Sequence, residues 1–265
     1  MRQLCAKCLS SVRTLTKMLD VGKPILPTCL ALACFSLAQY ALDWEFSLES
    51  RMPVFKVLHF PHVLLRKPST PVEKFTPGLK QFAADMIETM NAYEGIGLAA
   101  PQVGILKRLI VVDVRPYFEN TALKEWHGTY TYTLDGKSTE LPSPIILVNP
   151  AIVSKTEEIT FPYDGCLSFP GVERGQTTRW KNIVLEAKDT EGRAIRIESD
   201  GILSICLQHE MDHLEGVLFI DRVQGKVSED EVVADIEDHD NDASTRRRLK
   251  KMKLIDARAQ KLDFL

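Results

Sequence analysis

The chain has 265 residues, of which 45% are hydrophobic and 26% are charged, as in an ordinary globular protein of one large or two small domains. Its formal net charge of −3 provides no overall attraction to nucleic acid, so DNA is not an expected partner. Six cysteines in this length do not indicate a disulfide scaffold; in a reducing compartment they fit core positions, metal ligands or nucleophiles.

Residues 1–51 differ in character from the rest of the chain. The charged residues before Asp20 are all basic, and an apolar run interrupted by Pro27 and Gln39 follows over 25–42. This order is typical of a targeting sequence or a weak membrane anchor, although the run is short and polar for a spanning helix. The alternative is an upstream mis-start, because the sequence from Met52 reads as a natural domain start. Either way, we expect 1–51 to be an extension outside the working domain.

Residues 76–95 carry the pattern of an amphipathic helix. Thr76 and Pro77 are a good N-cap and first helical residue. Apolar side chains then recur at helical spacing, at Leu79, Phe82, Ala83, Met86, Ile87 and Met90. Gly95 ends the run and opens the stretch "GIGLAAPQ" (95–102). On its own this glycine-rich stretch is a weak motif, because most such loops are only turns.

Strand patterns follow in the middle of the chain. Three apolar runs indicate strands, at 108–114, 145–153 and 182–189, and 193–199 is expected to pair with the last of them. The long polar connection 115–145 contains "TYTYTLDGKST", whose alternation around Asp135-Gly136 predicts a hairpin.

A second helix is predicted over "SDGILSICLQHEMDHLEG", residues 199–216. Ser199 or Asp200 can cap its start, and Gly216 ends it. Apart from a few positions the segment is apolar on all sides, which is typical of a buried helix. We therefore expect this helix at the centre of the core.

The buried helix carries His209, Glu210 and His213, which spell H-E-x-x-H. Residues four apart lie on one helix face, so both imidazoles can bind one metal ion, while Glu210 can reach a water on that metal. Without a metal, two buried imidazoles would leave polar atoms unsatisfied, at about 1–3 kcal/mol per group. The motif therefore predicts a metal site.

The third ligand must come from elsewhere in the chain. The protease pattern HExxHxxGxxH fails, because Phe219 occupies the position of its last histidine, and Glu229 and Glu231 lie in a charged segment. Upstream, "YDGCLSFPG" (163–171) offers Cys166, and a thiolate is a good ligand for a borderline divalent ion. Cys206 competes, but it lies in the apolar helix and fits a packing or pocket-lining position better. With Cys166 the site becomes Cys-His-His with an open position, as in catalytic centres.

The end of the chain is strongly charged. Ser228 and Glu231 form a capping box, an acidic run follows over 229–242, and "RRRLKKMK" occupies 246–253. We expect a solvated terminal helix with a frayed acidic linker here.

Three segments together, "GIGLAAPQ", "DGCLS" and "QHEMDH", resemble in this order the signature motifs of the peptide deformylases, and the similarity covers about residues 53–225. The resemblance implies an α+β fold, with antiparallel or mixed β-sheets wrapped around the central metal-binding helix, plus an N-terminal amphipathic helix and a C-terminal helix. It also implies removal of the formyl group from the N-terminal formyl-methionine of new polypeptides. The expected domains are thus the extension 1–51, the catalytic domain 53–225 and a charged tail or helix 226–265.

By this resemblance Cys166, His209 and His213 hold one divalent metal, which is Fe(II) in much of the family and often replaced by Zn, Ni or Co. Glu210 is expected to be the general base and then the general acid. The Gln102 side chain and the Leu167 backbone N–H are expected to stabilise the oxyanion.

The substrate peptide is expected to lie extended beside the sheet edge at Gly95, Ile96 and Gly97. The methionine side chain is expected in a pocket near Ile96, Ile202, Ile205, Cys206 and His209.

The sequence departs from the family pattern at three places. Asp164 stands where the second motif usually begins with Glu, and a contact from this position to Arg179 is expected. An extra residue after "SFPG" shifts a substrate-binding Arg to Arg174. The connection 115–145 is longer than in compact members, which indicates a lid or a partner surface.

Two alternative functions stay open from the sequence, an HExxH metallopeptidase and an inactive member of the family that binds the ribosome. The basic segment Arg246–Lys253 resembles the terminal helix by which some members of the family dock on the ribosome. We expect a monomer in the bacterial cytoplasm, with an organellar or membrane-associated location as the alternative that residues 1–51 raise.

Overall fold

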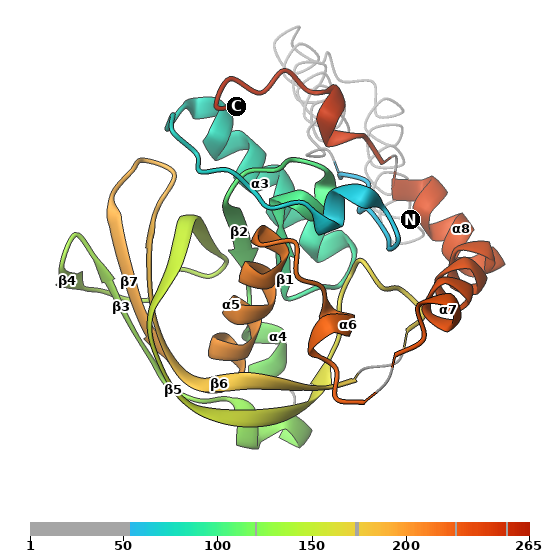
Figure 1. The fold of residues 1–265 in the computed structure, drawn as a ribbon. Helices are drawn as coiled ribbons and strands as arrows, with labels where there is room; N and C mark the ends of the chain where they lie inside the picture. Colours follow the sequence, from blue (N-terminus) through green and yellow to red (C-terminus); the bar gives the residue numbers. More distant parts are fainter. Residues whose placement is uncertain (1–53, 120, 173–174, 226, 253) are drawn as a thin grey trace, which may run out of the picture. The chain divides into compact units, whose positions relative to one another are not determined.

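The computed structural model describes residues 54–119, 121–172, 175–225, 227–252 and 254–265, and the whole of the expected extension 1–51 lies outside them. Met52–Leu265 forms one compact unit. Its strands form a seven-stranded sheet in the order β1-β2-β5-β6-β7-β3-β4, with antiparallel pairing throughout. Figure 1 shows this sheet curling around α5 (Gly201–Leu214), with α3 (Pro77–Ala92) beyond β1 and β2. The predicted α+β fold with a central helix is confirmed.

The helix α3 begins and ends close to its predicted limits. The Thr76 side chain accepts a hydrogen bond from the Leu79 backbone N–H at 3.2 Å, and Pro77 is the first helical residue. A short 3-10 helix, η1 (Val63–Arg66), precedes α3, and β1 (Gly97–Ala99) and the 3-10 helix η2 (Ala100–Val103) follow it.

The short strand β2 separates two parts of the core. Along β2 (Leu109–Val112), Ile110 and Val112 pack in the cluster around α5, whereas Leu109 and Val111 pack in the cluster around α3. Successive strand residues point to opposite faces, so a strand covered on both faces is apolar throughout. This arrangement is why residues 109–112 are all apolar.

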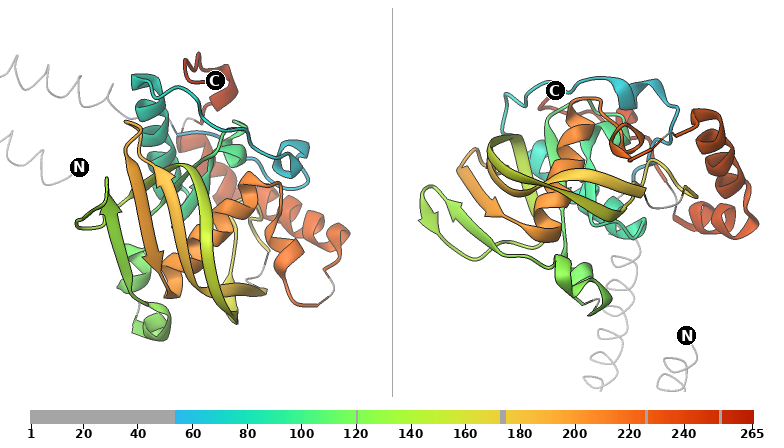
Figure 2. Two further views of the ribbon diagram at one scale, coloured as in Figure 1. Left: turned by 60° about the vertical axis from the view of Figure 1, so that its left-hand side comes forward. Right: turned by 60° about the horizontal axis from the view of Figure 1, so that its bottom comes forward.

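The other predicted strands are present, two of them longer than expected. They are β5 (Ile145–Asp164), β6 (Gly175–Lys188) and β7 (Ala194–Ser199), and β7 pairs with β6 as predicted. The extra length of β5 and β6 lies in polar, alternating sequence whose outer side chains face solvent, so hydrophobicity did not mark its ends. Figure 2 shows these strands side by side along the curved sheet.

The connection 115–145 is folded. It contains α4 (Arg115–Phe118), the 3-10 helix η3 (Thr121–Trp126) and a hairpin of β3 (Tyr130–Leu134) and β4 (Lys137–Ser138). Asp135 and Gly136 both have positive φ, as the Asp-Gly turn predicts. The hairpin joins the large sheet through β3 and β7.

The central helix is capped differently from the prediction. Asp200 occupies the N-cap position, but its carboxylate accepts a hydrogen bond from the Thr129 backbone N–H and none from the helix. The side chain fastens the start of α5 to the segment before β3, a long-range contact that the local sequence could not reveal.

The prediction of a frayed acidic linker is wrong. After the short helix α6 (Phe219–Arg222), residues Glu229–Asn241 form helix α7, which begins with the predicted Ser228 cap and buries Val232 and Ile236. The basic residues follow in α8 (Ala243–Met252), which has no buried residue, in line with the expected solvated helix.

The last residues of the chain return to the core around α3. A 3-10 helix η4 (Ala257–Ala259) buries Ala257, and Phe264 packs against Phe82 with ring centroids 5.3 Å apart. The segment 226–265 is therefore a structural part of the same unit, and only α8 within it has no buried residue. No helix within the described ranges is long and apolar enough to cross a membrane.

Candidate metal centre

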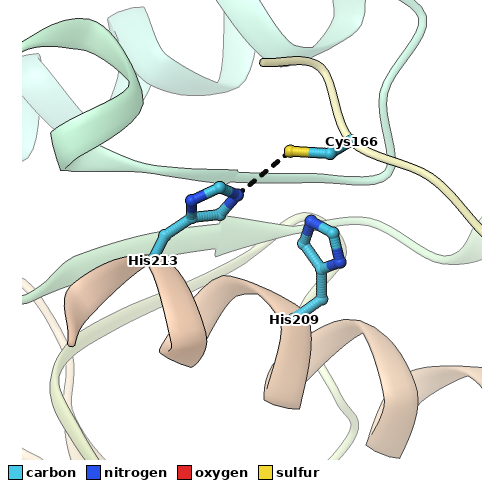
Figure 3. Close-up of side chains that lie close together, drawn as sticks. All are labelled: Cys166, His209 and His213. Carbon is cyan, nitrogen blue, oxygen red and sulfur yellow. Dashed lines mark hydrogen bonds between the residues drawn. The ribbon is translucent and has the colours of Figure 1, made fainter. Parts of the chain in front are cut away.

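The two histidines of α5 and Cys166 lie together in the core. His209 and His213 project from neighbouring turns of α5 toward Cys166, which comes from the loop after β5 (Figure 3). One ligand atom from each of the three residues lies within 4.8 Å of the others, and Cys166 Sγ is 3.1 Å from His213 Nε2. A thiolate and two imidazoles on one side of a cavity fit a borderline divalent metal ion with an open position.

A hydrogen bond sets the tautomer of His209. Its Nδ1 is 2.9 Å from Asp164 Oδ1, and since an ionised carboxylate only accepts, Nδ1–H must donate. Burial disfavours the charged imidazole of His209, but attraction to Asp164 and Cys166 outweighs it and raises the pKa of His209 well above its usual value. Metal binding at Nε2 would therefore displace a proton and leave the arrangement common to ligating histidines. In His213, burial lowers the pKa well below its usual value, so the imidazole is neutral and able to bind a metal.

Asp164 itself is held by a buried ionic network. Arg179 donates to Asp164 Oδ2 at 3.1 and 2.7 Å and to Asp212 Oδ2 at 2.5 Å, while Thr177 Oγ1 donates to Asp164 Oδ2 at 2.8 Å. Burial opposes ionisation of Asp164, but attraction to His209 and Arg179 outweighs it and holds the pKa of Asp164 well below its usual value. The contact that we expected between Asp164 and Arg179 is confirmed.

Gln102 connects the glycine-rich stretch to the metal ligands. Its Oε1 accepts from the Ala99 N–H at 2.7 Å, so Nε2 must point the other way. Nε2 lies 3.2 Å from Ser168 Oγ, to which it donates, and 3.6 Å from Cys166 Sγ. The amide N–H of Gln102 is thus directed at the metal centre.

Glu210 is buried beside the metal ligands. One of its oxygens, Oε2, has no hydrogen-bond partner among the described residues. Burial raises the pKa of Glu210 to about 7, in the range that suits a group which both takes up and releases a proton near neutral pH. A side chain at Gly97 would meet Glu210 Oε1 and Cys206 Sγ at 2.2 and 2.9 Å, so glycine is required for this close approach.

The metal centre opens into a cavity of about 260 Å³. The predicted residues that line it are Gly95, Ile96, Gly97, Gln102, Cys166, Leu167, Ile202, Ile205, Cys206, His209 and Glu210. Two predicted site residues are not among those that line the cavity. His213 is not a lining residue, but its Nε2 lies 3.1 Å from Cys166 Sγ, and Arg174 is outside the described residues.

Further residues line the cavity that the sequence did not indicate: Glu94, Tyr117, Phe161, Tyr163, Phe169 and Val172. Four of these residues, in β5 and the following loop, lie close to Cys166 in the sequence. Their proximity to the motif could therefore have indicated that they line the cavity. Tyr117 had no such signal, because it lies in the long connection and reaches the cavity only through the tertiary fold.

Comparison with known proteins agrees with this geometry. Residues 54–229 match the family model described as polypeptide deformylase. The chain is 42% identical to a peptide deformylase of Hamiltonella defensa over 170 residues, which are 64% of this chain and 85% of the relative.

Solved structures give the same result. A peptide deformylase of Legionella pneumophila is 32% identical, with a TM-score of 0.54 over 75% of this chain and 98% of the other. A peptide deformylase of Ehrlichia chaffeensis in complex with actinonin is 31% identical, with a TM-score of 0.59 over 72% of this chain and 100% of the other. The chain therefore belongs to the polypeptide deformylase family, metal-dependent hydrolases that remove the formyl group from N-terminal formyl-methionine.

Proposed function

We propose that this chain deformylates N-formyl-methionyl nascent peptides with Cys166, His209 and His213 as metal ligands and Glu210 as the acid–base group. The observation that supports this most strongly is the convergence of the three ligand atoms within 4.8 Å, with Glu210 on the same cavity. The family membership favours this reading over an HExxH metallopeptidase. The presence of all three ligands and Glu210 also argues against an inactive member of the family.

A thiolate and two imidazoles suit a divalent ion such as Fe(II), Zn, Ni or Co, and the family resemblance favours Fe(II) among them. A divalent ion held by Cys166, His209 and His213 would supply Lewis-acid chemistry, which activates water as a nucleophile and polarises a carbonyl.

The residues around the metal supply the remaining chemistry. Glu210, with its raised pKa and unpartnered oxygen, takes the proton of the attacking water and delivers it to the leaving amine. The Gln102 amide, directed at the centre, and the Leu167 backbone N–H stabilise the negative charge that develops on the formyl oxygen.

The cavity walls accommodate the peptide. The chain from Gly95 to Gly97 presents backbone groups along one wall, where an extended peptide can pair as an added strand. The methionine side chain occupies the apolar part of the cavity near Ile202, Ile205 and Cys206, which suits an unbranched thioether.

The test compares formyl-Met-Ala-Ser with the unformylated peptide Met-Ala-Ser, using protein purified without oxygen to keep an Fe(II) site intact. We expect formate release from the first and no peptide-bond cleavage of either. Glu210→Gln should retain the metal and lose about 10²–10⁴-fold in kcat, the contribution of a general acid–base group. Near-normal turnover by Glu210→Gln with a full metal content would refute the acid–base role.

We also propose that α8 docks on the ribosome. Its residues Arg246, Arg247, Arg248, Lys250 and Lys251 form a basic helix without buried residues. Such a helix suits a phosphate backbone, and binding should weaken as salt rises. Co-sedimentation with ribosomes should fall when Arg246, Arg247 and Lys250 are replaced together by Glu, and an unchanged, salt-insensitive association would refute this role.

We further propose that the protein is a monomer in a compartment where translation starts with formyl-methionine, such as the bacterial cytoplasm. Light scattering tests the oligomeric state, and a dimer would contradict the first point. N-terminal sequencing of the native protein tests the location, because a cleaved leader would favour an organelle over the bacterial cytoplasm.

A further inference from the structure

The catalytic cavity extends away from the metal along α5. Its lining includes His209, Cys206, Ile205 and Ile202 in that order toward the start of the helix. At 1.5 Å per residue, His209 and Ile202 are separated by about 10 Å along the helix axis. The part near Ile202 is apolar, because Ile202 and Ile205 belong to the cluster packed around α5.

Tyr117 lines the same cavity from the long connection 115–145. It lies on α4, which Figures 1 and 2 show beside the starting end of α5. Tyr117 packs against the α5 core cluster together with Trp126. The Trp126 ring in turn meets Phe161, another residue of the cavity wall, with centroids 5.0 Å apart. The position of α4 beside the start of α5 favours the apolar end of the cavity for Tyr117, away from the metal ligands.

The segment around Tyr117 is fixed at both ends. At its start, Arg115 donates to Asp113 Oδ1 at 2.9 Å, and Ser143 Oγ donates to the same oxygen at 2.9 Å. At its end, His127 Nε2 lies 3.1 Å from the Tyr117 carbonyl oxygen and donates to it. These contacts tie the segment around Tyr117 to neighbouring parts of the fold.

Close packing joins the connection 115–145 to α5. Gly201, the first residue of α5, has a φ of +58°, and an added Cβ there would lie 2.6 Å from both Gly128 Cα and the Trp126 carbonyl oxygen. The Asp200 N–H also donates to the Thr129 carbonyl oxygen at 3.0 Å. The start of α5 and the connection thus touch backbone to backbone.

We propose that Tyr117 is a specificity-determining residue that closes the far end of the methionine pocket and limits the length of the first side chain. This inference rests on the proposed function, because it takes the apolar part of the cavity as the site of that side chain. On this proposal, an unbranched side chain as long as that of methionine should be accepted, while one that is two methylenes longer should meet the Tyr117 ring.

The experiment measures kcat/KM for three peptides that differ only in the first residue: formyl-Met-Ala-Ser, formyl-norleucyl-Ala-Ser and formyl-2-aminooctanoyl-Ala-Ser. Tyr117→Ala opens the end of the pocket. Each additional buried methylene contributes about fourfold. We therefore expect the ratio of the aminooctanoyl to the norleucyl substrate to rise about 15-fold over that of the unaltered protein.

Tyr130→Ala is the matched control, because Tyr130 is an exposed tyrosine in the same connection and does not line the cavity. It should leave the ratio unchanged. Should Tyr117→Ala fail to fold, Tyr117→Trp decides the question, because a larger ring should shorten the pocket. It should lower kcat/KM for formyl-Met-Ala-Ser more than for formyl-Ala-Ala-Ser.

An unchanged substrate ratio in a folded Tyr117→Ala protein, or an equal loss on short and long substrates in Tyr117→Trp, overturns the inference. The proposed function fails separately, since it requires the unaltered protein to release formate from formyl-Met-Ala-Ser. If the unaltered protein is inactive on that peptide, both proposals fall.

Discussion

Asp164 is the residue that joins the metal ligands to the rest of the core. Its two oxygens face different partners, Oδ1 the ring of His209 and Oδ2 the side chains of Arg179 and Thr177. A carboxylate that fixes a ligating histidine in this way orients the ring and raises its basicity. The aspartate makes the contact expected of the usual glutamate, because Arg179 bonds to it and also to Asp212.

Replacement of Asp164 by alanine should weaken metal binding by about 10–100-fold, the usual loss when the partner of a ligating histidine is removed. Chelator competition followed by metal analysis measures the affinity. Glu158→Ala, an exposed carboxylate on the same strand, should bind the metal normally. An equal affinity in the two variants would show that Asp164 does not orient the ligand.

Replacement of Cys166 by serine should remove most of the bound metal, because a neutral hydroxyl is a much poorer ligand than a thiolate for these ions. The metal-to-protein ratio after dialysis is the measurement. Cys206→Ala removes the other described free thiol, which is buried and outside the ligand set, and should keep the full ratio. Loss of metal in both variants would contradict the assignment of Cys166 alone.

The sequence indicated the residues of the candidate metal centre because they lie in short motifs whose residue types suit metal binding. H-E-x-x-H sets two ligands by helix periodicity, and Cys166 was favoured because a thiolate suits the same ion. Tyr117 could not be predicted in this way, because a tyrosine in a polar connection has no local property that marks it as a pocket residue.

At the scale of elements, the C-terminal segment is where the structure departs most from the sequence interpretation. An acidic run followed by a basic run has few apolar residues, so it resembles a solvated segment. Yet α7 buries Val232 and Ile236, and the last ten residues bury Ala257 and Phe264. Two apolar residues on one side of a short helix are enough for packing when a complementary surface already exists, and only the tertiary structure provides that surface.

The aromatic ring of Phe264 should be required for full stability. Phe264→Ala should lower the free energy of unfolding by about 3–5 kcal/mol, because it removes a ring that is 1% exposed and packs against Phe82. Urea denaturation measures this difference. Leu265→Ala, next to it but 55% exposed, should change the stability by less than about 0.5 kcal/mol. Equal effects of the two substitutions would show that the chain end is not packed as described.

At the scale of the whole molecule, residues Met52–Leu265 form one compact unit. The family match ends at residue 229, but the core around α3 includes residues as late as Phe264. The main chain also connects the two ends of the unit, because the Lys56 N–H donates to the Ile255 carbonyl oxygen at 2.8 Å and the Ile255 N–H donates to the Val54 carbonyl oxygen at 2.9 Å. The start and the end of the unit therefore stabilise each other.

A protein that begins at Met52 should fold and deformylate like the full chain, because the catalytic unit has its own core and contains every proposed site residue. Thermal unfolding and kcat/KM on formyl-Met-Ala-Ser are the measurements. A shorter protein that ends at residue 229, the limit of the family match, is the informative comparison and should be strongly destabilised. Loss of activity on removal of 1–51 alone would contradict the proposed boundary.

The sequence by itself indicated the helices α3 and α5, the strand pattern and the residues that we propose as metal ligands, since each depends on periodicity or on the chemistry of neighbouring residues. Only the tertiary structure decided what covers the core around α3, which connection forms the far wall of the cavity and how Asp164 is held. Those features depend on contacts between residues far apart in the chain, such as Phe82 with Phe264 and Trp126 with Phe161. No local pattern encodes such pairs, because the complementary surfaces arise only when the sheet has curled around α5.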